Sequence, residues 1–542
     1  MFSLLSKLWK KETPDVTSAA ILIGLASFAS RIVGVIRDRL LASTFGAGDS
    51  LDAYYSAFRL PDFFYQLIVL GAITAGFIPV FAEYLEKKGD HEARALVEKV
   101  FSTMTTVLVI TCVIIAITAN YLVPFTVPGF TGDKLTLTIS LTRILLISTV
   151  FLGMSAVMGG VLQTMRRFVS FAFAPIIYNV GILGGIIFLV PIYGVSGVAM
   201  GVVAGAIMHF VLQSIVAIPL GFQKLRKPTF KDSGVIRILK LTIPRVGALA
   251  ASQINLIILL AFASTMSAGS VAIFNLANNL QFVPIGLIGI SFAVAAFPAF
   301  SKFAAVDDLS GLRRSFLSTT RKVFFLIIPS TAILLLLRAQ IIRVLYGAGE
   351  FDWSATIQTA DVLAMFVLSL IAQAATPVVT RVFYALKDSK TPFVIAIISM
   401  ATNIITAFLL KDYFGVAGLA AAFSIGSFIQ FGLLWYMLRK KLGGHLDGKE
   451  LSISLTKTAL ASLALFGFGW FARQIVGNIF PLRTFWQVAL QVVAALGVGG
   501  LAFTVLAWLL RVREFAEFIS AAKAKLLKKA TVGEGVDQAQ GI

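Results

Sequence analysis

Charged residues are scarce in this 542-residue chain: Asp, Glu, Lys and Arg make up 13% of it, about half the share of a typical soluble domain. Hydrophobic residues make up 58%, and the mean hydropathy is +0.91. Apolar runs such as "FSTMTTVLVITCVIIAITANYLV" reach the roughly 20 residues that a helix needs to cross a bilayer. This composition excludes an ordinary water-soluble protein and predicts an all-α polytopic membrane protein.

Cysteine and histidine are nearly absent. The single cysteine, Cys112, lies in an apolar run and cannot form a disulfide within the chain. The three histidines, His91, His209 and His445, lie far apart, without Cys or His neighbours at the spacing of metal ligands. We therefore expect no metal site, and we expect His209 to be a buried, hydrogen-bonded residue of a helix.

Sequence motifs for catalysis and for ATP binding are also missing. The chain has no glycine loop that ends in Lys-Ser/Thr, no HExxH, and no pair of carboxylates within an apolar span. The stretches "GAGDSLD" and "GAGEFD" are typical of turns at span ends. We expect a transporter without a cofactor, driven by the membrane potential or by an ion gradient, with the coupling ion left open.

The net charge of +20 could suggest a nucleic-acid partner, because a basic face is the usual sign of one. Here the Lys and Arg residues are scattered among short loops between apolar spans, so we expect no such partner. They concentrate in the amino terminus, in alternate loops such as "EKKGDHEAR" and "RKKLGGHLDGKE", and in the tail. The positive-inside rule therefore predicts that both termini are cytoplasmic.

Apolar spans between polar breaks predict fourteen transmembrane helices. Their predicted extents are 17–45, 51–86, 94–123, 134–164, 168–191, 195–222, 235–266, 270–302, 311–338, 354–386, 391–411, 415–439, 452–475 and 484–510.

Residues about 220 positions apart repeat one another. "YGVSGVAMGVVAGAIMHF" matches "FGVAGLAAAFSIGSFIQF", which pairs Gly194 with Gly415 and Gly205 with Gly426. The repeat predicts two pseudo-symmetric six-helix lobes, related by an axis along the membrane normal, plus two extra C-terminal helices. The predicted divisions are an amphipathic cytoplasmic lead-in (1–16), the N-lobe (17–222), a cytoplasmic linker (223–234), the C-lobe (235–440), the two further helices (441–511) and a basic cytoplasmic tail (512–542). We expect the tail to begin as a surface helix on anionic lipid.

The first two predicted helices contain an unusual group of charges within "SRIVGVIRDRLLASTFGAGDSLDAYYSAFRLPDFF". An arginine at the centre of a membrane helix costs roughly 2.5–3.5 kcal/mol. Arg31 lies about fourteen residues from the cytoplasmic end of its helix, which places it near the middle of the bilayer. Arg37, Asp38 and Arg39 follow on the same helix, and Arg59 lies on the second helix.

Three explanations of these charges differ in what they predict. Snorkelling could bring Arg39 to the interface, but Arg31 is too deep. An ion pair with Asp38 or Asp52 could neutralise part of the charge. We favour a water-filled cavity whose surplus cations bind a phosphate-bearing substrate, because the arginine fork donates two hydrogen bonds to phosphate and keeps its proton.

Several segments resemble the signatures of the lipid II flippase family (MurJ). They are "SRIVGVIRDRLLASTFGAG", "LDAYYSAFRLPDF", "GAITAGFIPVFAEY", "LQTMRRFVSFAFAPIIYN" and "RVFYALKDSKTPF", in the order and spacing of the family. The resemblance covers essentially all the predicted spans. It implies the fold of the multidrug and oligosaccharidyl-lipid exporter superfamily, with two lobes around a central cavity and a lipid-tail groove formed by the last two helices.

The resemblance also implies a function. The family moves lipid II, the undecaprenyl-pyrophosphate-linked peptidoglycan precursor, from the inner to the outer leaflet of the bacterial inner membrane. Membrane lipids surround such a protein, and cell-wall synthesis machinery is a conceivable partner, although no sequence feature indicates a site for it.

Functional residues of the family fall on matching positions of this chain. Arg31, Arg37 and Asp52 match the motif, Arg59 stands where the family has a basic residue, and Arg381 precedes "FYALKD". The resemblance implies that the first-helix arginines and Arg59 hold the pyrophosphate. We expect Asp52 to pair with an arginine in one conformational state and to release it in another.

The chain departs from the family pattern at four positions. Where the family has a basic pair and then an acidic residue after "LPDFF", this chain has Tyr65, Gln66 and Leu70. Asn279 stands where an arginine is expected. These changes leave open a different pyrophosphate lipid, altered gating, or compensation by another cation.

Two arginines and three amides bear on that question. Arg143 and Arg245 are the candidates for compensating cations in or near the cavity. A sodium site attributed to the C-lobe of the family lacks acidic partners here, where only Gln253, Asn255 and Asn403 are available. The identity of a coupling ion is therefore not predicted.

Other functions predict other residues. An exporter of another polyprenyl-linked glycan would share the cationic cavity, and only its substrate would differ. A multidrug antiporter would need acidic residues for its cationic substrates. A membrane glycosyltransferase would need acidic catalytic or metal-binding residues at loop edges, and the predicted outer loops are short and poor in carboxylate pairs.

Overall fold

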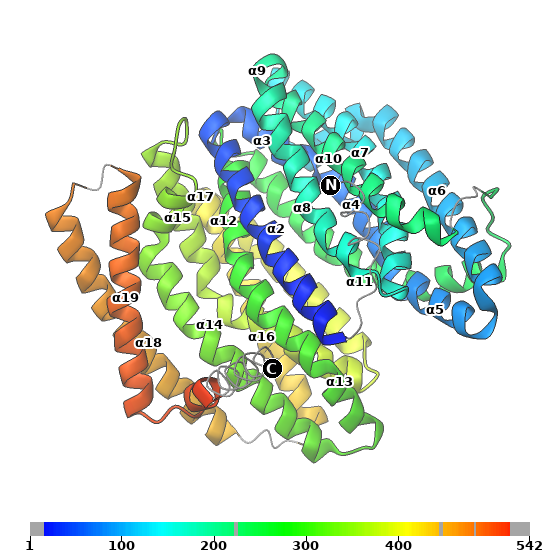
Figure 1. Ribbon diagram of the computed structural model, residues 1–542. Helices are drawn as coiled ribbons and strands as arrows, with labels where there is room; N and C mark the ends of the chain where they lie inside the picture. Colours follow the sequence, from blue (N-terminus) through cyan, green and yellow to red (C-terminus); the bar gives the residue numbers. More distant parts are fainter. Residues whose placement is uncertain (1–15, 222–225, 444–447, 482–483, 521–542) are drawn as a thin grey trace, which may run out of the picture. The chain divides into compact units, whose positions relative to one another are not determined.

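The computed structural model describes residues 16–221, 226–443, 448–481 and 484–520, which are helical throughout apart from short connections and contain no strand (Figure 1). The chain divides into two compact units. Unit 1 comprises Met1–Leu276, Leu345–Thr356 and Ala407–Leu419, and unit 2 comprises Ala277–Val344, Ile357–Thr406 and Ala420–Ile542. The predicted lobe boundaries stay predictions.

Unit 1 holds the first ten helices of the described chain. They are α2 (Val16–Phe45), α3 (Asp49–Ala57), α4 (Arg59–Phe64), α5 (Ile78–Lys87), α6 (Gly89–Thr126), α7 (Gly132–Thr164), α8 (Phe168–Gly184), α9 (Val190–Tyr193), α10 (Val195–Ala217) and α11 (Ser233–Ser264). Between them lie three π-helical segments, η1 (Tyr65–Leu70), η2 (Ile73–Phe77) and η3 (Gly185–Leu189), and a 3-10 turn, η4 (Ile218–Leu220).

Unit 2 holds most of the remaining helices. They are α12 (Ser270–Pro284), whose first turns belong to unit 1, the π-helical segment η5 (Ile285–Ile290), α13 (Ser291–Ala305), α14 (Leu309–Leu345), α15 (Trp353–Leu368), α16 (Leu370–Ala385), α17 (Lys390–Lys441), α18 (Gly448–Ile479) and α19 (Phe485–Leu509). The helices α18 and α19 pack side by side (Figure 1).

Nine helices of the described chain are long and apolar enough to cross a membrane, and α15 with α16, bent by 43°, gives a tenth. The 52-residue element α17 contains two predicted spans, 391–411 and 415–439, which meet at a kink where Gly415 has a non-helical backbone. The other predicted spans lie on α2, on the interrupted run from α3 to α5, and on α11. The all-α membrane architecture is confirmed, whereas the count of fourteen crossings stays a prediction.

The internal repeat predicted from sequence is also a repeat of backbone conformation. Gly194 (φ 56°, ψ −142°) and Gly415 (φ 54°, ψ −136°) have nearly the same angles. Of the thirteen described residues with positive φ, twelve form pairs 217–223 positions apart. The pairs are Gly46 with Gly269, Gly89 with Asp307, Gly132 with Gly349, Arg166 with Lys387, Gly194 with Gly415, and Gly221 with Gly443. The segments η1 and η5 also lie 220 positions apart.

Glycines let α8 and α10 pack with their backbones in contact. A Cβ atom added at Gly181 would lie 2.3 Å from the Cα atom of Gly205, and one added at Gly185 would lie 2.6 Å from the Cα atom of Gly201. Small residues at four-residue spacing are how membrane helices approach closely without a hydrophobic driving force. This packing fixes α8, which carries a polar residue of the candidate site.

Candidate substrate site

Arg31 lies at the midpoint of α2, with a half-buried side chain. It forms no hydrogen bond or ion pair with any described residue. Its five N–H donors are therefore available to a ligand, as expected for a residue that binds an anion.

Arg37 is held in a fixed orientation on α2. Its Nε and Nη2 atoms donate to Oδ1 of Asp38 at 2.9 and 2.7 Å, and its Nη1 atom donates to Oδ1 of Asn179 on α8 at 2.9 Å. The Asn179 amide donates in turn to Oγ of Ser30 at 3.3 Å and to the carbonyl of Pro175 at 3.0 Å. The ion pair with Asp38 expected as an alternative is present, but it neutralises only one of the arginines.

Tyrosines surround this pair. Tyr54 and Tyr55 on α3 are buried close to Arg37, and the hydroxyl of Tyr55 has no hydrogen-bond partner among the described residues. Tyr178 on α8 is one residue before Asn179. The phenol groups are weakly polar and can donate hydrogen bonds.

Arg59 begins α4 and is only partly satisfied. Its Nη2 atom donates to Oδ1 of Asn275 on α12, and Asp62 lies close enough to interact with its charge. Its Nε atom is buried and has no partner among the described residues. A buried donor without a partner costs roughly 1–3 kcal/mol, so Arg59 keeps a donor that a bound anion or a change of conformation could satisfy.

Asp52 is the most completely bonded residue of the predicted set. Its carboxylate, 1% exposed, accepts from Nζ of Lys134 at 2.7 Å and from the backbone N–H groups of Gly269 and Ala272, each at 2.8 Å. Lys134 also pairs with Asp49 at 2.6 Å. The two N–H groups lie at the start of α12 and have no intrahelical acceptor, so Asp52 caps that helix. Its partner in this conformation is a lysine, not the expected arginine.

The connections near Asp52 touch one another through their backbones. The N–H of Glu350 donates to the carbonyl of Ser43 at 2.9 Å. A Cβ atom added at Gly349 would lie 2.2 Å from that same oxygen, and one added at Gly269 would lie 2.1 Å from the oxygen of Ala47. Only glycine fits such contacts. The chain segments after α2, before α12 and after α14 are therefore closed against each other, on the side that the charge pattern places outside the cell.

The two arginines considered as compensating cations lie elsewhere. Arg143 is exposed on α7, where its Nε donates to the carbonyl of Ala116 at 3.0 Å and its Nη2 donates to Oδ1 of Asn120 at 3.1 Å. Both partners belong to α6, and none of the other candidate residues is among them. Arg245 lies on α11, but its side chain is outside the described residues.

The remaining predicted residues lie on other helices. Gln253 and Asn255 are half-buried on α11, and Asn403 is buried in α17. Asn279 is exposed on α12, at the repeat position of Arg59. Arg381 lies on α16, with its guanidinium 5.0 Å from the centre of the Phe297 ring.

Three of the four residues that depart from the family pattern, Tyr65, Gln66 and Leu70, lie on η1. Tyr65 packs against the hydrophobic core of unit 1, and Gln66 is half-buried. The side chain of Leu70 is outside the described residues. Because π-helical turns shift the register of a helix and occur often at functional sites, η1 can redirect the side chains that follow Asp62.

Several residues of the site were not predicted. Lys134, Asn179 and Asn275 bind predicted residues, and each lies within or at the edge of an apolar span. A polar residue in a membrane helix is a signal that sequence reasoning can use, but it does not identify the partner. His209 was predicted to be hydrogen-bonded, and its Nδ1 lies 2.6 Å from Oγ of Ser155. Among the described residues, no group of three His, Cys, Asp or Glu side chains is placed to hold a metal ion.

Comparisons with known proteins agree with the residue pattern. Residues 41–513 match the family described as "Lipid II flippase MurJ". The chain is 30% identical over 426 residues to the lipid II flippase MurJ of Burkholderia cenocepacia, covering 76% of this chain and 81% of that protein. It is 29% identical over 460 residues to the probable lipid II flippase MurJ of Vibrio cholerae, covering 83% and 86%.

Solved structures share the fold. A structure of "Lipid II flippase MurJ, inward closed conformation" superposes with a TM-score of 0.74 at 24% identity, over 90% of this chain and 99% of that chain. An inward-facing multidrug resistance MATE family transporter of the MOP superfamily gives 0.65 at 16% identity, over 76% and 95%. The predicted exporter fold is confirmed.

Proposed function

The chain belongs to the lipid II flippase family MurJ, and from this premise we propose that it carries lipid II from the inner to the outer leaflet of the bacterial inner membrane. It acts by alternating access, as a transporter and not as an enzyme, with both termini in the cytoplasm. Peptidoglycan synthesis, and with it cell shape, depends on this step, because the precursor is made inside and used outside.

The observation that carries the proposal is the surplus of positive charge on α2 and α4. Arg37 is paired with Asp38, and Arg59 lies near Asp62, whereas Arg31 forms no ion pair with any described residue and the buried Nε of Arg59 has no partner among them. An intramembrane charge is costly and usually faces a cavity or a partner. A pyrophosphate diester supplies negative charge and acceptor oxygens for these two arginines.

The residues divide the work of binding. Arg31 has all its donors available, and Arg59 has an unsatisfied Nε, so these two supply hydrogen bonds to the pyrophosphate oxygens. Arg37 is oriented by Asp38 and Asn179, so its side chain loses little conformational entropy when the substrate binds. The tyrosines near Arg37 can donate further hydrogen bonds to the sugar or phosphate oxygens.

Asp52 and its partners keep the outer side closed while the substrate binds from inside. Outward opening separates Asp52 from Lys134 or from the start of α12. Breaking a buried ion pair costs roughly 3–5 kcal/mol if nothing replaces the partner. This free-energy cost is lower if Lys134 or Asp52 gains water or another partner when the pair separates. An arginine is the partner for Asp52 expected from the sequence.

The membrane potential is the driving force that the charges favour. Moving one elementary charge through 100 mV is worth about 2.3 kcal/mol. An anionic headgroup that moves outward from a negative interior gains this free energy for each charge that crosses the field. Coupling to an ion gradient is the alternative, and the amides Gln253, Asn255 and Asn403 are where its ion would be sought.

Complementation tests the proposal. In cells whose own lipid II flippase can be switched off, wild type restores growth, and Arg31→Ala, Arg37→Ala and Arg59→Ala do not, at matched expression. Arg143→Ala is the control, because it removes an exposed arginine from the same half of the chain and leaves the candidate site intact. Failure of well-expressed wild type, in cells and in vesicles with fluorescent lipid II and an imposed potential, overturns the proposal.

A second candidate function is export of another polyprenyl-linked glycan. Tyr65, Gln66 and Asn279 favour it, because they stand where the resemblance implies ionic residues in the family. Rescue of a strain that lacks a flippase for surface-polysaccharide repeat units, without rescue of the lipid II flippase strain, would establish this function instead. A multidrug antiporter is disfavoured, because its cationic substrates would be repelled by the arginines.

A further inference from the structure

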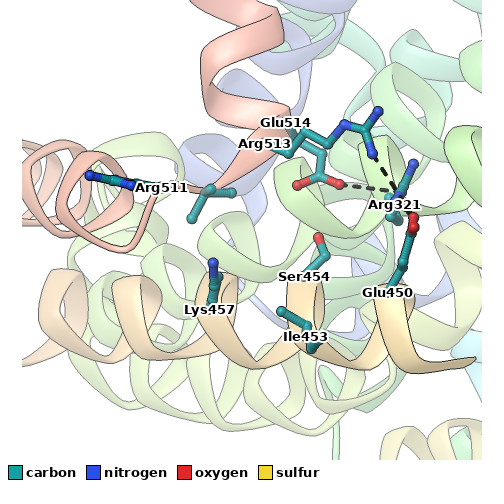
Figure 2. Close-up of a pocket in the computed structure, with 9 residues that line it drawn as sticks. Arg321, Glu450, Ile453, Ser454, Lys457, Arg511, Arg513 and Glu514 are labelled. Carbon is teal, nitrogen blue, oxygen red and sulfur yellow. Dashed lines mark hydrogen bonds and ion pairs between the residues drawn. The ribbon is translucent and has the colours of Figure 1, made fainter.

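A pocket of about 160 Å³ lies in unit 2, far in sequence from the candidate substrate site. It is formed by α14, by the first turns of α18, and by the residues that follow α19 (Figure 2). Nine residues line it: Arg321, Glu450, Ile453, Ser454, Lys457, Arg511, Val512, Arg513 and Glu514. By the predicted orientation it lies at the cytoplasmic ends of the two C-terminal helices.

One side of the pocket is an ion-pair network whose charges are matched. Arg321 on α14 binds Glu450 of α18 at 2.8 Å and lies 3.4 Å from Glu514, whose side chain is 4% exposed. Arg513 lies 3.9 Å from Glu450 and 3.6 Å from Glu517. Figure 2 shows Glu450, Arg513 and Glu514 gathered around Arg321. The network ties α14, α18 and the segment 513–520 together, and its three acids account for the charges of Arg321, Arg513 and the neighbouring Lys322.

The other side of the pocket carries positive charge without acidic partners. Lys457 of α18 and Arg511 form no hydrogen bond or ion pair through their side chains with any described residue. Ser454 precedes Lys457 by three residues, so its hydroxyl lies on the same face of α18. Two cations and a hydroxyl donor therefore line one pocket, which is the donor set that a phosphate group requires.

The backbone at Arg511 shows that a basic residue is kept there at a cost. Arg511 has a φ of 49°, and the bonds from its N–H to Trp508 and from Val512 N–H to Ala507 form a helix C-cap in which glycine is the usual residue. A left-handed conformation is unfavourable for an ordinary residue, because its Cβ crowds the following carbonyl oxygen. Attraction to the end of α19 offsets part of this cost, and an anion in the pocket would offset more.

Apolar side chains continue from the pocket along the two helices. Ile453 lines the pocket, and Leu460 lies two turns further along the same face of α18. Val505, Trp508 and Leu509 are exposed on α19, which packs against α18. A free phosphate would contact only the polar part, whereas a phospholipid would use both parts at once.

We propose that this pocket binds the phosphate of an acidic phospholipid of the inner leaflet, held by Lys457, Arg511 and Ser454, with its acyl chains against α18 and α19. This site goes beyond lipid II transport and does not depend on it. A lipid bound here bridges α18 and the segment after α19, next to the network that attaches both to α14.

Lipid binding to the full-length protein tests the site. The protein in mild detergent is titrated with phosphatidylglycerol, phosphatidylcholine or inorganic phosphate, and bound lipid is counted by native mass spectrometry. The test variant is Lys457→Gln with Arg511→Gly, since glycine suits the left-handed position and the fold is kept. The matched control is Lys240→Gln with Lys449→Gln, which removes the same charge from exposed positions on the same predicted side.

The expected result is a loss of about fivefold in phosphatidylglycerol affinity for each charge removed, with no loss in the control. Phosphatidylcholine binds wild type more weakly than phosphatidylglycerol, and inorganic phosphate does not displace the lipid. Equal affinity of wild type and the double variant overturns the proposal, as does an equal loss in the control. Displacement by millimolar phosphate assigns the pocket to a free anion. Thermal unfolding midpoints within a few degrees of wild type establish that the variants are folded.

Discussion

The two halves of the chain have nearly the same backbone and very different charges. Left-handed turns recur at matching positions and the π-helical segment η1 matches η5, yet the arginines and aspartates of α2 to α4 have no ionic counterparts 220 residues later. Arg59 corresponds to Asn279, Asp52 to Ala272, and the stretch around Arg37 to the apolar run "LIILL". The repeated glycines and turns build the fold, whereas the unrepeated charges carry the substrate chemistry.

Asp52 illustrates a contact that requires different residues at equivalent positions of the two halves. Its carboxylate binds the N–H of Ala272, which is its own counterpart in the repeat. An aspartate at both positions would place two negative charges at this contact, and an alanine at both would leave the start of α12 uncapped. A pseudo-symmetric contact of this kind needs an asymmetric pair of residues.

The largest effect is expected from moving the arginine between the halves. The double variant Arg59→Asn with Asn279→Arg keeps the composition but removes the cation from the neighbourhood of Asp62 and Asn275. We expect lipid II transport in vesicles to fall roughly 30-fold or more, since truncating one partner of a buried charged pair costs roughly 2–5 kcal/mol. Asn279→Arg alone is the control and should transport near the wild-type rate. Full activity of the exchanged protein would show that the halves are interchangeable.

The next largest effect is a faster opening of the contact between Asp52 and the start of α12. With Cys112 replaced by Ser, a single Ser270→Cys reports on the start of α12, because Ser270 is buried beside the amides that Asp52 binds. We expect Asp52→Asn to raise its rate of labelling by a membrane-impermeant thiol reagent by about tenfold, since a charge-assisted hydrogen bond is worth roughly 1.5–3 kcal/mol.

Asp49→Asn is the matched control for this labelling. Asp49 also pairs with Lys134, but its side chain is 63% exposed, so its ion pair contributes little. We expect less than a twofold change. Equal labelling rates for the two variants would contradict the role assigned to the buried carboxylate.

A smaller effect is expected on stability, where alanine substitutions at two glycines of the repeat should differ in their cost. A Cβ atom at Gly205 would lie 2.4 Å from the carbonyl oxygen of Tyr178, and one at Gly426 would lie 3.1 Å from the carbonyl oxygen of Ser399. We expect Gly205→Ala to lower the free energy of unfolding by about 1–3 kcal/mol, since the backbones must separate. Gly426→Ala should be close to neutral, because the gain in helix propensity offsets the mild contact. Thermal unfolding in detergent measures both.

Two further glycines provide the internal standard. A Cβ atom at Gly197 would lie 2.6 Å from the oxygen of Leu189, and one at Gly418 would lie 2.5 Å from the oxygen of Leu410. Gly197→Ala and Gly418→Ala should therefore be equally destabilising. A clear difference between them would show that distance to the neighbouring backbone does not set the cost.

The smallest effect is a pH dependence at Asp388, a residue of the second half that has no acidic counterpart in the first half. Burial would raise the pKa of Asp388, but hydrogen bonds from Lys441 and Thr391 lower it to about 2. The stabilisation is thus present above about pH 4, the pKa of an unfolded aspartate, and is lost as the pH falls toward 2. Lys441 is 40% exposed, so we expect at most about 1 kcal/mol.

Asp388→Asn removes this dependence. Its thermal midpoint should lie slightly below that of wild type at pH 6, and the two should converge as the pH approaches 2. In the first half the corresponding residue is Arg167, so Arg167→Gln should show no such convergence. A constant difference between wild type and Asp388→Asn over this range would mean that the carboxylate contributes no charge interaction.

Much of this architecture is predictable from residue order. Apolar length indicates each helix, and the pairing of Gly194 with Gly415 predicts the matching turns. The arginines of α2 mark a functional helix, because nothing else explains their cost in a bilayer. The number of helices was harder to predict from the sequence. The helices α2 and α11 carry charged residues, and two predicted spans meet at the kink at Gly415 within α17.

The partners of the charged residues were not predictable. Asp52 meets Lys134 and Gly269, which are 82 and 217 positions away, and helical periodicity contains no information on such distances. Arg143 illustrates the same limit: its sequence context resembles that of a buried membrane arginine, but it is exposed on α7 and bonds to α6.

The sequence by itself determined the membrane environment, the helices, the repeat and the helix that carries the charge, because each depends on local hydropathy, spacing or turn chemistry. Only the tertiary structure decided which charged side chains form ion pairs and which arginines keep N–H donors without a partner among the described residues. That outcome depends on how helices distant in sequence pack, and in particular on backbone contacts at glycines such as Gly269 and Gly349 that bring the connections together.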